Sequence, residues 1–138
     1  MNIALMADES KQELMVQFCI AYCGTLSKHV VCATNTTGRM VAEATGLDVH
    51  LFLSHEHGGC QQIGARISYN ELDMVLFFTG PDNTDYTEDL EYICRLCDKN
   101  SVPLATNIAT AELLIMGLAR GDLDYREILY PRKKQVLI

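Results

Sequence analysis

Short apolar runs alternate with segments of helical periodicity along most of this chain. In the first helical segment, apolar residues recur at positions 14, 15, 18, 19 and 22, a spacing that places them on one helical face. By the same reasoning, strands are predicted at 3–7, 29–34, 49–53, 73–78 and 103–106, and helices at 11–23, 39–45, 61–69, 88–98 and 110–120. The fourth strand is apolar after its first residue, which is typical of a parallel sheet covered on both faces.

The regular alternation of strands and helices predicts an α/β fold. We expect a single open parallel sheet of about five strands in a flavodoxin-like three-layer domain. The domain would span residues 1–138, with its core at 2–120 and a C-terminal tail at 122–138. In that tail a basic segment, 131–134, precedes an apolar end, 135–138, which either a neighbouring subunit or the domain itself would cover.

Size and charge narrow the classes of partner. With 138 residues and 49% hydrophobic content, the chain can bury one sizeable core. Its net charge of −7 argues against a nucleic-acid groove, which needs a basic face, but leaves room for a small anionic ligand. No apolar run reaches the ~18 residues of a membrane span, and Met1–Ile3 begins a strand rather than a signal peptide. We therefore expect a cytoplasmic protein with no membrane partner.

Six cysteines raise the question of disulfides. Cys19, Cys23, Cys94 and Cys97 lie in helical segments and Cys32 in a strand, positions typical of reduced thiols in a protein core. The Cys94-x-x-Cys97 spacing also occurs in redox pairs, but those open a helix and this pair lies inside one.

Polar clusters follow four of the predicted strands directly, at 8–11, 34–38, 54–60 and 79–89. Because the carboxyl ends of parallel strands meet at one edge of the sheet, where such folds bind ligands, we expect a site there.

The second cluster has the chemistry of an anion site. It offers hydroxyl groups and backbone N–H groups at the start of a helix, from Thr34, Asn35, Thr36 and Thr37. Ser54 would end on the same edge, and Lys11 would add positive charge. The alternatives are an ordinary helix cap with a glycine turn and a solvated lysine.

Carboxylates and metal ligands accompany this cluster. Asp8, Glu9 and Asp89 each follow a strand or open a helix, where they serve as acid or base or merely cap the helix. His55, His57 and Cys60 are residue types that bind zinc, although a loop that holds an anion would spread them apart.

One loop carries a resemblance to a known family. Residues 54–62 read Ser-His-Glu-His-Gly-Gly-Cys-Gln-Gln, which resembles the active-site loop S-G-P-x-G-G-D-Q-Q of the methylglyoxal synthase family. Further matching stretches lie at 3–5, 33–38, 44–47, 58–65 and 103–111, so the resemblance covers roughly residues 2–120.

The resemblance implies a compact α/β domain, assembled as a homohexamer. It implies conversion of dihydroxyacetone phosphate, or a related small phosphorylated metabolite, to methylglyoxal and inorganic phosphate without a cofactor. By position, the phosphate-binding residues would be Thr34, Asn35, Thr36, Thr37 and Ser54, with Lys11, His55 and Gly59 beside them.

The departure from the family falls at the catalytic base, because Cys60 stands where the family has Asp. A free thiol has a pKa of ~8.5, against roughly 4 for a carboxylate, so a thiolate base needs a neighbour such as His57 to lower its pKa. Otherwise Asp8 or Glu9 takes the substrate proton, and Asp89 and Tyr86 assist the oxygens. Two further hypotheses are a non-catalytic module that binds a phosphorylated ligand, and a metal-dependent variant that uses His55, His57 and Cys60.

Overall fold

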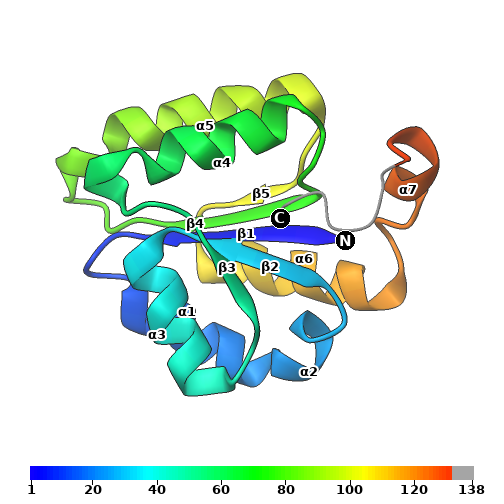
Figure 1. The fold of residues 1–138 in the computed structure, drawn as a ribbon, viewed down its shortest axis with the longest axis horizontal. Helices are drawn as coiled ribbons and strands as arrows, with labels where there is room; N and C mark the ends of the chain where they lie inside the picture. The colour runs from blue at the N-terminus through cyan, green and yellow to red at the C-terminus, as the bar shows by residue number, and fades with distance from the viewer. Residues whose placement is uncertain (132–138) are drawn as a thin grey trace.

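The structure, a computed structural model, describes residues 1–131 and consists of one parallel sheet between two layers of helices (Figure 1). The strands are β1 (Asn2–Ala7), β2 (Val30–Ala33), β3 (Val49–Leu51), β4 (Met74–Phe78) and β5 (Leu104–Ala105). They run in the order β3-β2-β1-β4-β5, and all pairs are parallel. The predicted α/β fold with a five-stranded open parallel sheet is confirmed.

The helices fall on two sides of this sheet. They are α1 (Gln12–Ala21), α2 (Cys23–Leu26), α3 (Asn35–Thr45), α4 (Gly59–Ser68), α5 (Thr87–Asn100), α6 (Ile108–Arg120) and α7 (Tyr125–Leu129), with 3-10 turns η1 (His55–His57) and η2 (Thr84–Tyr86). Figure 1 shows α4 and α5 on one face and α1, α3 and α6 on the other.

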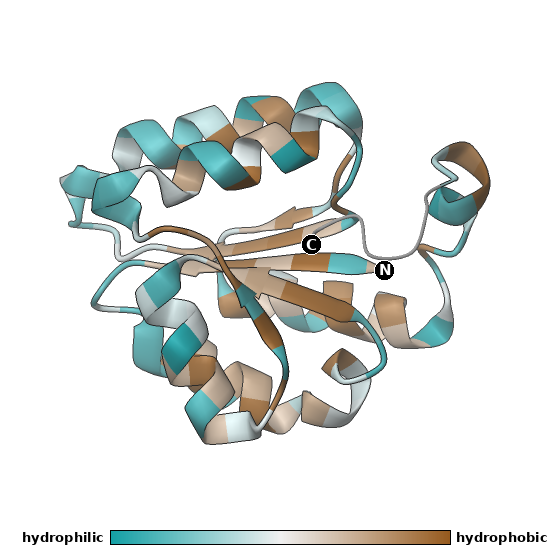
Figure 2. Ribbon diagram, in the orientation of Figure 1, coloured by the Kyte–Doolittle hydropathy of each residue, from teal (hydrophilic) through white to brown (hydrophobic). Residues whose placement is uncertain are grey.

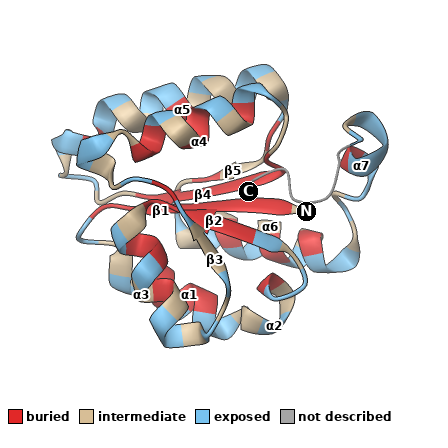
Figure 3. Cartoon of the chain, in the orientation of Figure 1, coloured by how far each residue is buried: buried red, intermediate tan, exposed pale blue. Residues whose placement is uncertain are grey.

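Two apolar clusters, one on each face of the sheet, form the core. Along β1, Ile3 and Leu5 pack on the side of α1 and α6, whereas Ala4 and Met6 pack on the side of α4 and α5. Side chains of a strand point alternately to opposite faces, so a strand that is covered on both faces must be apolar throughout. Figures 2 and 3 show the result: the central strands are hydrophobic and buried, and the outer faces of the helices are hydrophilic and exposed.

Four helices begin earlier than predicted, and two of them, α3 and α4, border the predicted site. α3 starts at Asn35 rather than residue 39, because Thr34 is extended (φ −62°, ψ 153°) and the chain turns into the helix directly after it. α4 starts at Gly59 rather than residue 61, after Gly58 takes the left-handed conformation (φ 102°). Cys60 therefore lies in the first turn of a helix and not in a loop. The third strand ends at Leu51 rather than residue 53.

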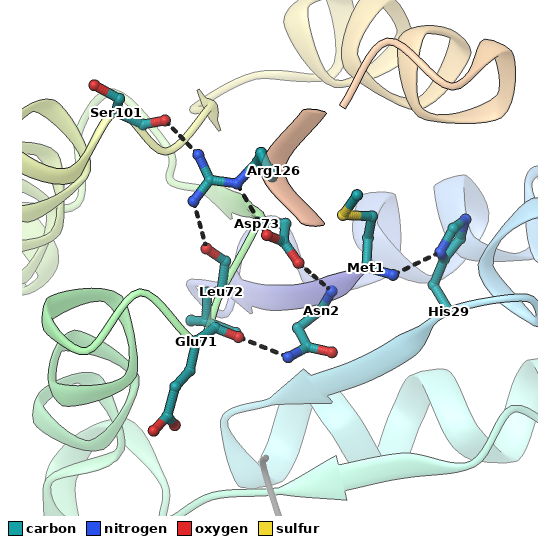
Figure 4. Close-up of polar contacts among 8 residues, drawn as sticks. All are labelled: Met1, Asn2, His29, Glu71, Leu72, Asp73, Ser101 and Arg126. Carbon is teal, nitrogen blue, oxygen red and sulfur yellow. Dashed lines mark hydrogen bonds and ion pairs between the residues drawn. The ribbon is translucent and has the colours of Figure 1, made fainter. Parts of the chain in front are cut away.

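A buried ion pair closes the edge of the sheet opposite these helix starts (Figure 4). Arg126 of α7 donates from Nε to Asp73 Oδ1 at 2.9 Å, and the two side chains are 1% and 0% exposed. Arg126 also donates to the carbonyl oxygens of Ser101 and Leu72, while the Asp73 carboxylate accepts the N–H of Asn2. The first part of the predicted tail is thus anchored to the domain by α7. Residues 132–138, with the basic segment and the apolar end, lie outside the described residues.

None of the helices in the described range combines the length and the hydrophobicity needed to cross a membrane.

Candidate functional site

A cavity of about 160 Å³ opens at the carboxyl ends of β1 and β2. Its lining joins residues from all four polar clusters predicted from the sequence, namely Glu9, Thr34, Thr36, Thr37, His55, Glu56 and Tyr86, with the neighbouring Ala7 and Gln12. A second, more open hollow lies beside it between Ser10, Lys11 and the loop 80–85. A small polar cavity therefore lies at the edge of the sheet where the site is predicted, but Lys11 lines the neighbouring hollow rather than the cavity itself.

The start of α3 forms one wall of the cavity. Thr34 is buried, Thr36 is exposed at the opening, and the hydroxyl group of Thr37 donates to the Ala7 carbonyl oxygen at 3.5 Å. The N–H groups of Thr36 and Thr37 lie in the first helical turn, where no intrahelical acceptor exists and the helix dipole favours an anion. Asn35 lies outside the lining, and its N–H donates to the carbonyl oxygen of Leu53.

The loop at 54–59, which contains Gly58 and Gly59, is held together by its own internal contacts next to the cavity. The hydroxyl group of Ser54 is 2.8 Å from His57 Nδ1, and the Ser54 carbonyl oxygen accepts the N–H of Gly59. A side chain at Gly59 would overlap the Leu53 carbonyl oxygen, so the close approach of α4 to this loop requires glycine. Ser54 and Gly59, predicted to bind substrate, shape the loop without lining the cavity.

The two carboxylates after β1 have different environments. Asp8 is fully buried and accepts hydrogen bonds from the N–H of Gly80 at 2.6 Å, the hydroxyl of Ser10 at 2.7 Å and the N–H of Lys11 at 3.1 Å. These bonds tie the ends of β1 and β4 together. Glu9 is exposed and lines the cavity, where Oε1 accepts the Tyr86 hydroxyl at 3.1 Å. Of these two candidates, only Glu9 presents its carboxylate to a ligand.

His55 and Tyr86 form the wall opposite the threonines. The two rings are stacked, with centroids 3.8 Å apart and an interplanar angle of 16°. His55 Nδ1 lies 2.6 Å from Asp89 Oδ2, a close contact that falls outside hydrogen-bond geometry for the ring N–H. Burial, and then the neighbouring Glu9, raise the pKa of Tyr86, so its hydroxyl group stays protonated and donates to Glu9.

Cys60 is inaccessible from the cavity. Its side chain is 0% exposed within the core cluster beneath α4 and α5, and Sγ lies 3.8 Å from the carbonyl oxygen of Asp89. Burial and the neighbouring Asp89 raise the pKa of the thiol to about 12. The sequence left open whether His57 lowers this pKa; the shift is in the opposite direction, and the His57 ring contacts Ser54 instead. A thiolate base at Cys60 is not supported.

The hypothetical metal triad does not assemble. Cys60 is buried in the core, His55 contacts Asp89 and His57 contacts Ser54. Within residues 1–131, no group of three or more His, Cys, Asp or Glu side chains is arranged to hold a metal ion. All six cysteines are free thiols, including the pair Cys94 and Cys97.

Besides the apolar Ala7, two polar lining residues were not among the predicted site residues. Gln12 projects from the first turn of α1, and Glu56 lies in η1 beside His55. Hydrogen bonds from its own backbone and from Ser54 lower the pKa of Glu56, which is therefore ionised at neutral pH. Neither a glutamine nor a glutamate marks a functional site by its residue type. The only signal in the sequence was therefore their position shortly after the first and third predicted strands.

Comparisons with known proteins agree on one family. The profile of the family described as MGS-like domain matches residues 15–106. The chain is 58% identical over 133 residues to a protein named methylglyoxal synthase from Caldicellulosiruptor saccharolyticus, covering 96% of this chain and 94% of that protein. It is 50% identical over 136 residues to one of the same name from Oceanobacillus iheyensis, covering 98% and 97%. The crystal structure of methylglyoxal synthase from Elizabethkingia anophelis superposes with a TM-score of 0.78 at 29% identity, covering 97% of this chain and 93% of that one.

Proposed function

Because the chain belongs to the methylglyoxal synthase family, we propose that its cavity binds dihydroxyacetone phosphate and eliminates phosphate from it to give methylglyoxal. The enzyme is then a carbon–oxygen lyase that works without a cofactor. The volume of the cavity, about 160 Å³, is well below the ~300–1,000 Å³ of pockets for drug-sized ligands, which supports a small substrate.

A single observation carries the assignment of roles: a solvent-exposed carboxylate and an anion cradle share one small cavity. Thr34, Thr36 and Thr37 offer hydroxyl and N–H groups on the α3 side, and Glu9 presents a carboxylate beside them. We assign phosphate binding to the threonines, aided by the dipole of α3. We assign proton abstraction to Glu9, since Asp8 is consumed by three hydrogen bonds and Cys60 is buried as a thiol.

The reaction then follows from ordinary carbonyl chemistry. Glu9 takes a proton from the hydroxymethyl carbon, which leaves an enediolate, and polar groups near Tyr86 and Asp89 assist its oxygens. The hydroxyl proton moves to the neighbouring enediolate oxygen, the carbon–carbon double bond shifts, and the C–O bond to phosphate breaks. The products are the enol of methylglyoxal, which tautomerises, and phosphate, which leaves with the proton that Glu9 had taken.

A steady-state assay with dihydroxyacetone phosphate tests this proposal. We expect inorganic phosphate and methylglyoxal in equal amounts, at a rate proportional to the enzyme concentration. Folded protein that binds the substrate in calorimetry but releases no phosphate would overturn the enzyme assignment in favour of a non-catalytic binding module. Assays with other small phosphorylated ketones and aldehydes determine how narrow the specificity is.

Three further expectations stay proposals. Two rest on the family resemblance: that Cys60 occupies the position of the family's catalytic Asp, and that the protein is a homohexamer. The third, that it works in the cytoplasm, rests on the sequence pattern. Light scattering on the purified chain measures the mass of the assembly. A mass near that of one 15.4 kDa chain would contradict the hexamer.

A further inference from the structure

The cavity has two sides of opposite electrostatic character. On one side, the first turn of α3 offers N–H groups and the hydroxyl group of Thr36, which suit an anion. On the side of His55 and Tyr86, the lining includes two carboxylates, those of Glu9 and Glu56. No lysine or arginine in the described part of the chain belongs to the lining. A ligand whose phosphate lies at α3 therefore places its other end among negative charges.

Glu56 supplies a permanent part of this negative charge. Hydrogen bonds from its own backbone and from Ser54 lower its pKa, so the carboxylate is ionised at neutral pH. Burial, then Glu9 and more weakly Glu56, raise the pKa of Tyr86, so the charge of Glu56 acts on the cavity wall. None of the ion pairs that the structure describes joins Glu56 to a lysine or an arginine. Its charge therefore also acts on a ligand in the cavity.

The loop pattern that this chain resembles has no carboxylate at the position of Glu56. In S-G-P-x-G-G-D-Q-Q the third residue is proline, and Glu56 stands there in this chain. The proposed reaction does not need Glu56 either, since Glu9 serves as the base. A second carboxylate weakens the binding of a nearby phosphate, because like charges repel. It can favour a ligand only through the group at the ligand's other end.

We propose that Glu56 is a specificity-determining residue that selects ligands by the charge of their non-phosphate end, admitting neutral or cationic groups and rejecting carboxylates. This inference rests on the proposed function and narrows its substrate class. The substrates are monophosphates whose remaining groups are carbonyl or hydroxyl groups, and small phosphorylated acids are excluded.

The proposed elimination is compatible with a fixed charge at Glu56. When Glu9 takes the substrate proton, Glu9 becomes neutral and the enediolate becomes negative. The number of negative charges at that end of the cavity therefore stays the same during the step. A carboxylate on the ligand differs, because it adds a charge that nothing in the lining removes.

The size of the effect follows from the exposure of Glu56. Because the side chain is exposed, water screens its charge, and the expected change in affinity is about threefold to tenfold per ligand charge. Salt screens an exposed charge further, since the Debye length falls from about 10 Å at 0.1 M to about 3 Å at 1 M. Discrimination by Glu56 should therefore weaken as salt is added.

Calorimetry with three monophosphates of similar size tests the proposal. Glycerol 3-phosphate has a neutral end, 3-phosphoglycerate has a carboxylate there, and serinol phosphate has an ammonium group. We expect the parent to bind 3-phosphoglycerate about tenfold more weakly than glycerol 3-phosphate, and serinol phosphate at least as tightly as glycerol 3-phosphate. Because Glu9 also contributes, the measured quantity is the change in the ratio of dissociation constants when Glu56 is substituted.

Glu56→Gln keeps the shape of the side chain and removes its charge. The ratio for 3-phosphoglycerate over glycerol 3-phosphate is expected to fall by about threefold or more and to depend less on salt than in the parent. Glu56→Asp keeps the charge and should keep most of the ratio. The matched control is Glu43→Gln, an exposed carboxylate of α3 outside the lining, which should keep the whole ratio.

Two results would overturn the role of Glu56. One is an unchanged ratio in Glu56→Gln; the other is an equal loss of affinity for all three ligands, which a merely structural role in the loop predicts. Thermal midpoints of the variants, compared with that of the parent, check that they fold. A parent that binds none of the three ligands defeats both the phosphate cradle and this inference. A parent that discriminates through Glu56 but releases no phosphate from dihydroxyacetone phosphate defeats the proposed function alone.

Discussion

Arg126 and Asp73 form an ion pair, Nε to Oδ1 at 2.9 Å, that is almost completely sealed from solvent at the edge of the sheet opposite the cavity. Removing one partner of such a pair leaves an uncompensated buried charge, at a cost of about 3–5 kcal/mol. Arg126→Ala is expected to lower the free energy of unfolding by that amount, measured by urea denaturation. The control is Arg120→Ala, whose pair with Asp122 is largely exposed and stabilises by less than about 1 kcal/mol. Equal effects of the two substitutions would contradict the role of the buried pair.

Glu9 and Asp8 are adjacent, but substituting them should have different effects, on catalysis at Glu9 and on stability at Asp8. Glu9→Gln removes the proposed base and is expected to lower kcat by at least about 100-fold and to stop exchange of the substrate C–H proton with solvent, because an amide accepts no proton. Stability should change little, since Glu9 is exposed. Asp8→Asn should instead lower the thermal midpoint, because the buried carboxylate accepts three hydrogen bonds. Glu13→Gln, in the exposed first turn of α1, is the matched control and should do neither.

Cys60 should be dispensable for the chemistry. Since the thiol is buried and its pKa is raised to about 12, Cys60→Ala is expected to keep kcat within about threefold of the parent at neutral pH. The free energy of unfolding should fall instead, because the substitution leaves a small void in the core. A thiol reagent should also leave Cys60 unmodified in the folded protein at pH 8. A loss of kcat comparable to that of Glu9→Gln, in a variant that still melts cooperatively, would restore Cys60 as the base.

Thr36 should matter for binding more than for turnover. It lines the cavity at the start of α3, where the hydroxyl and N–H groups are assigned to the phosphate. Thr36→Ala removes the hydroxyl and leaves the N–H, so KM is expected to rise by roughly 10-fold, the value of one hydrogen bond to a charged group. Thr25→Ala, at the opposite edge of the sheet, is the control. Calorimetry with inorganic phosphate should show the same loss of affinity, and unchanged affinity would remove Thr36 from the cradle.

Buried thiols should make the fold sensitive to alkali. Burial raises the pKa of Cys19, Cys32, Cys60 and Cys97 from 9.0 to about 12. Between these values the unfolded chain has lost thiol protons that the native state still holds, so the free energy of unfolding falls as pH rises. We expect the free energy of unfolding to be constant at pH 7–8 and to decline above pH 9. The midpoint of urea denaturation, measured at each pH, checks this. Cys32→Ala should make the decline shallower; Cys94→Ala, at a half-buried position, should not.

Local pattern determined the elements and the edge at which the site lies. Apolar runs such as 74–78 and the periodicity around Met15 and Phe18 predict their own secondary structure, because the strand and helix periods are properties of neighbouring residues. The strict alternation of those elements then predicts a parallel sheet. In a parallel sheet the carboxyl ends of all strands lie at the same edge. The family motifs at 33–38 and 58–65 could also be recognised from the sequence alone, since they are runs of consecutive residues.

Tertiary structure alone decided which of the clustered side chains face the cavity. Asp8 and Glu9 are indistinguishable by pattern. Only the tertiary structure brings the distant Gly80 N–H next to β1, through the pairing of β1 with β4, where it binds the Asp8 carboxylate, whereas Glu9 lines the cavity. Likewise, the contact of His55 with Tyr86 and the burial of Cys60 depend on how α5 packs against α4. These contacts join residues about 30 to 70 positions apart, and their geometry follows from the packing of whole elements, which no local period encodes.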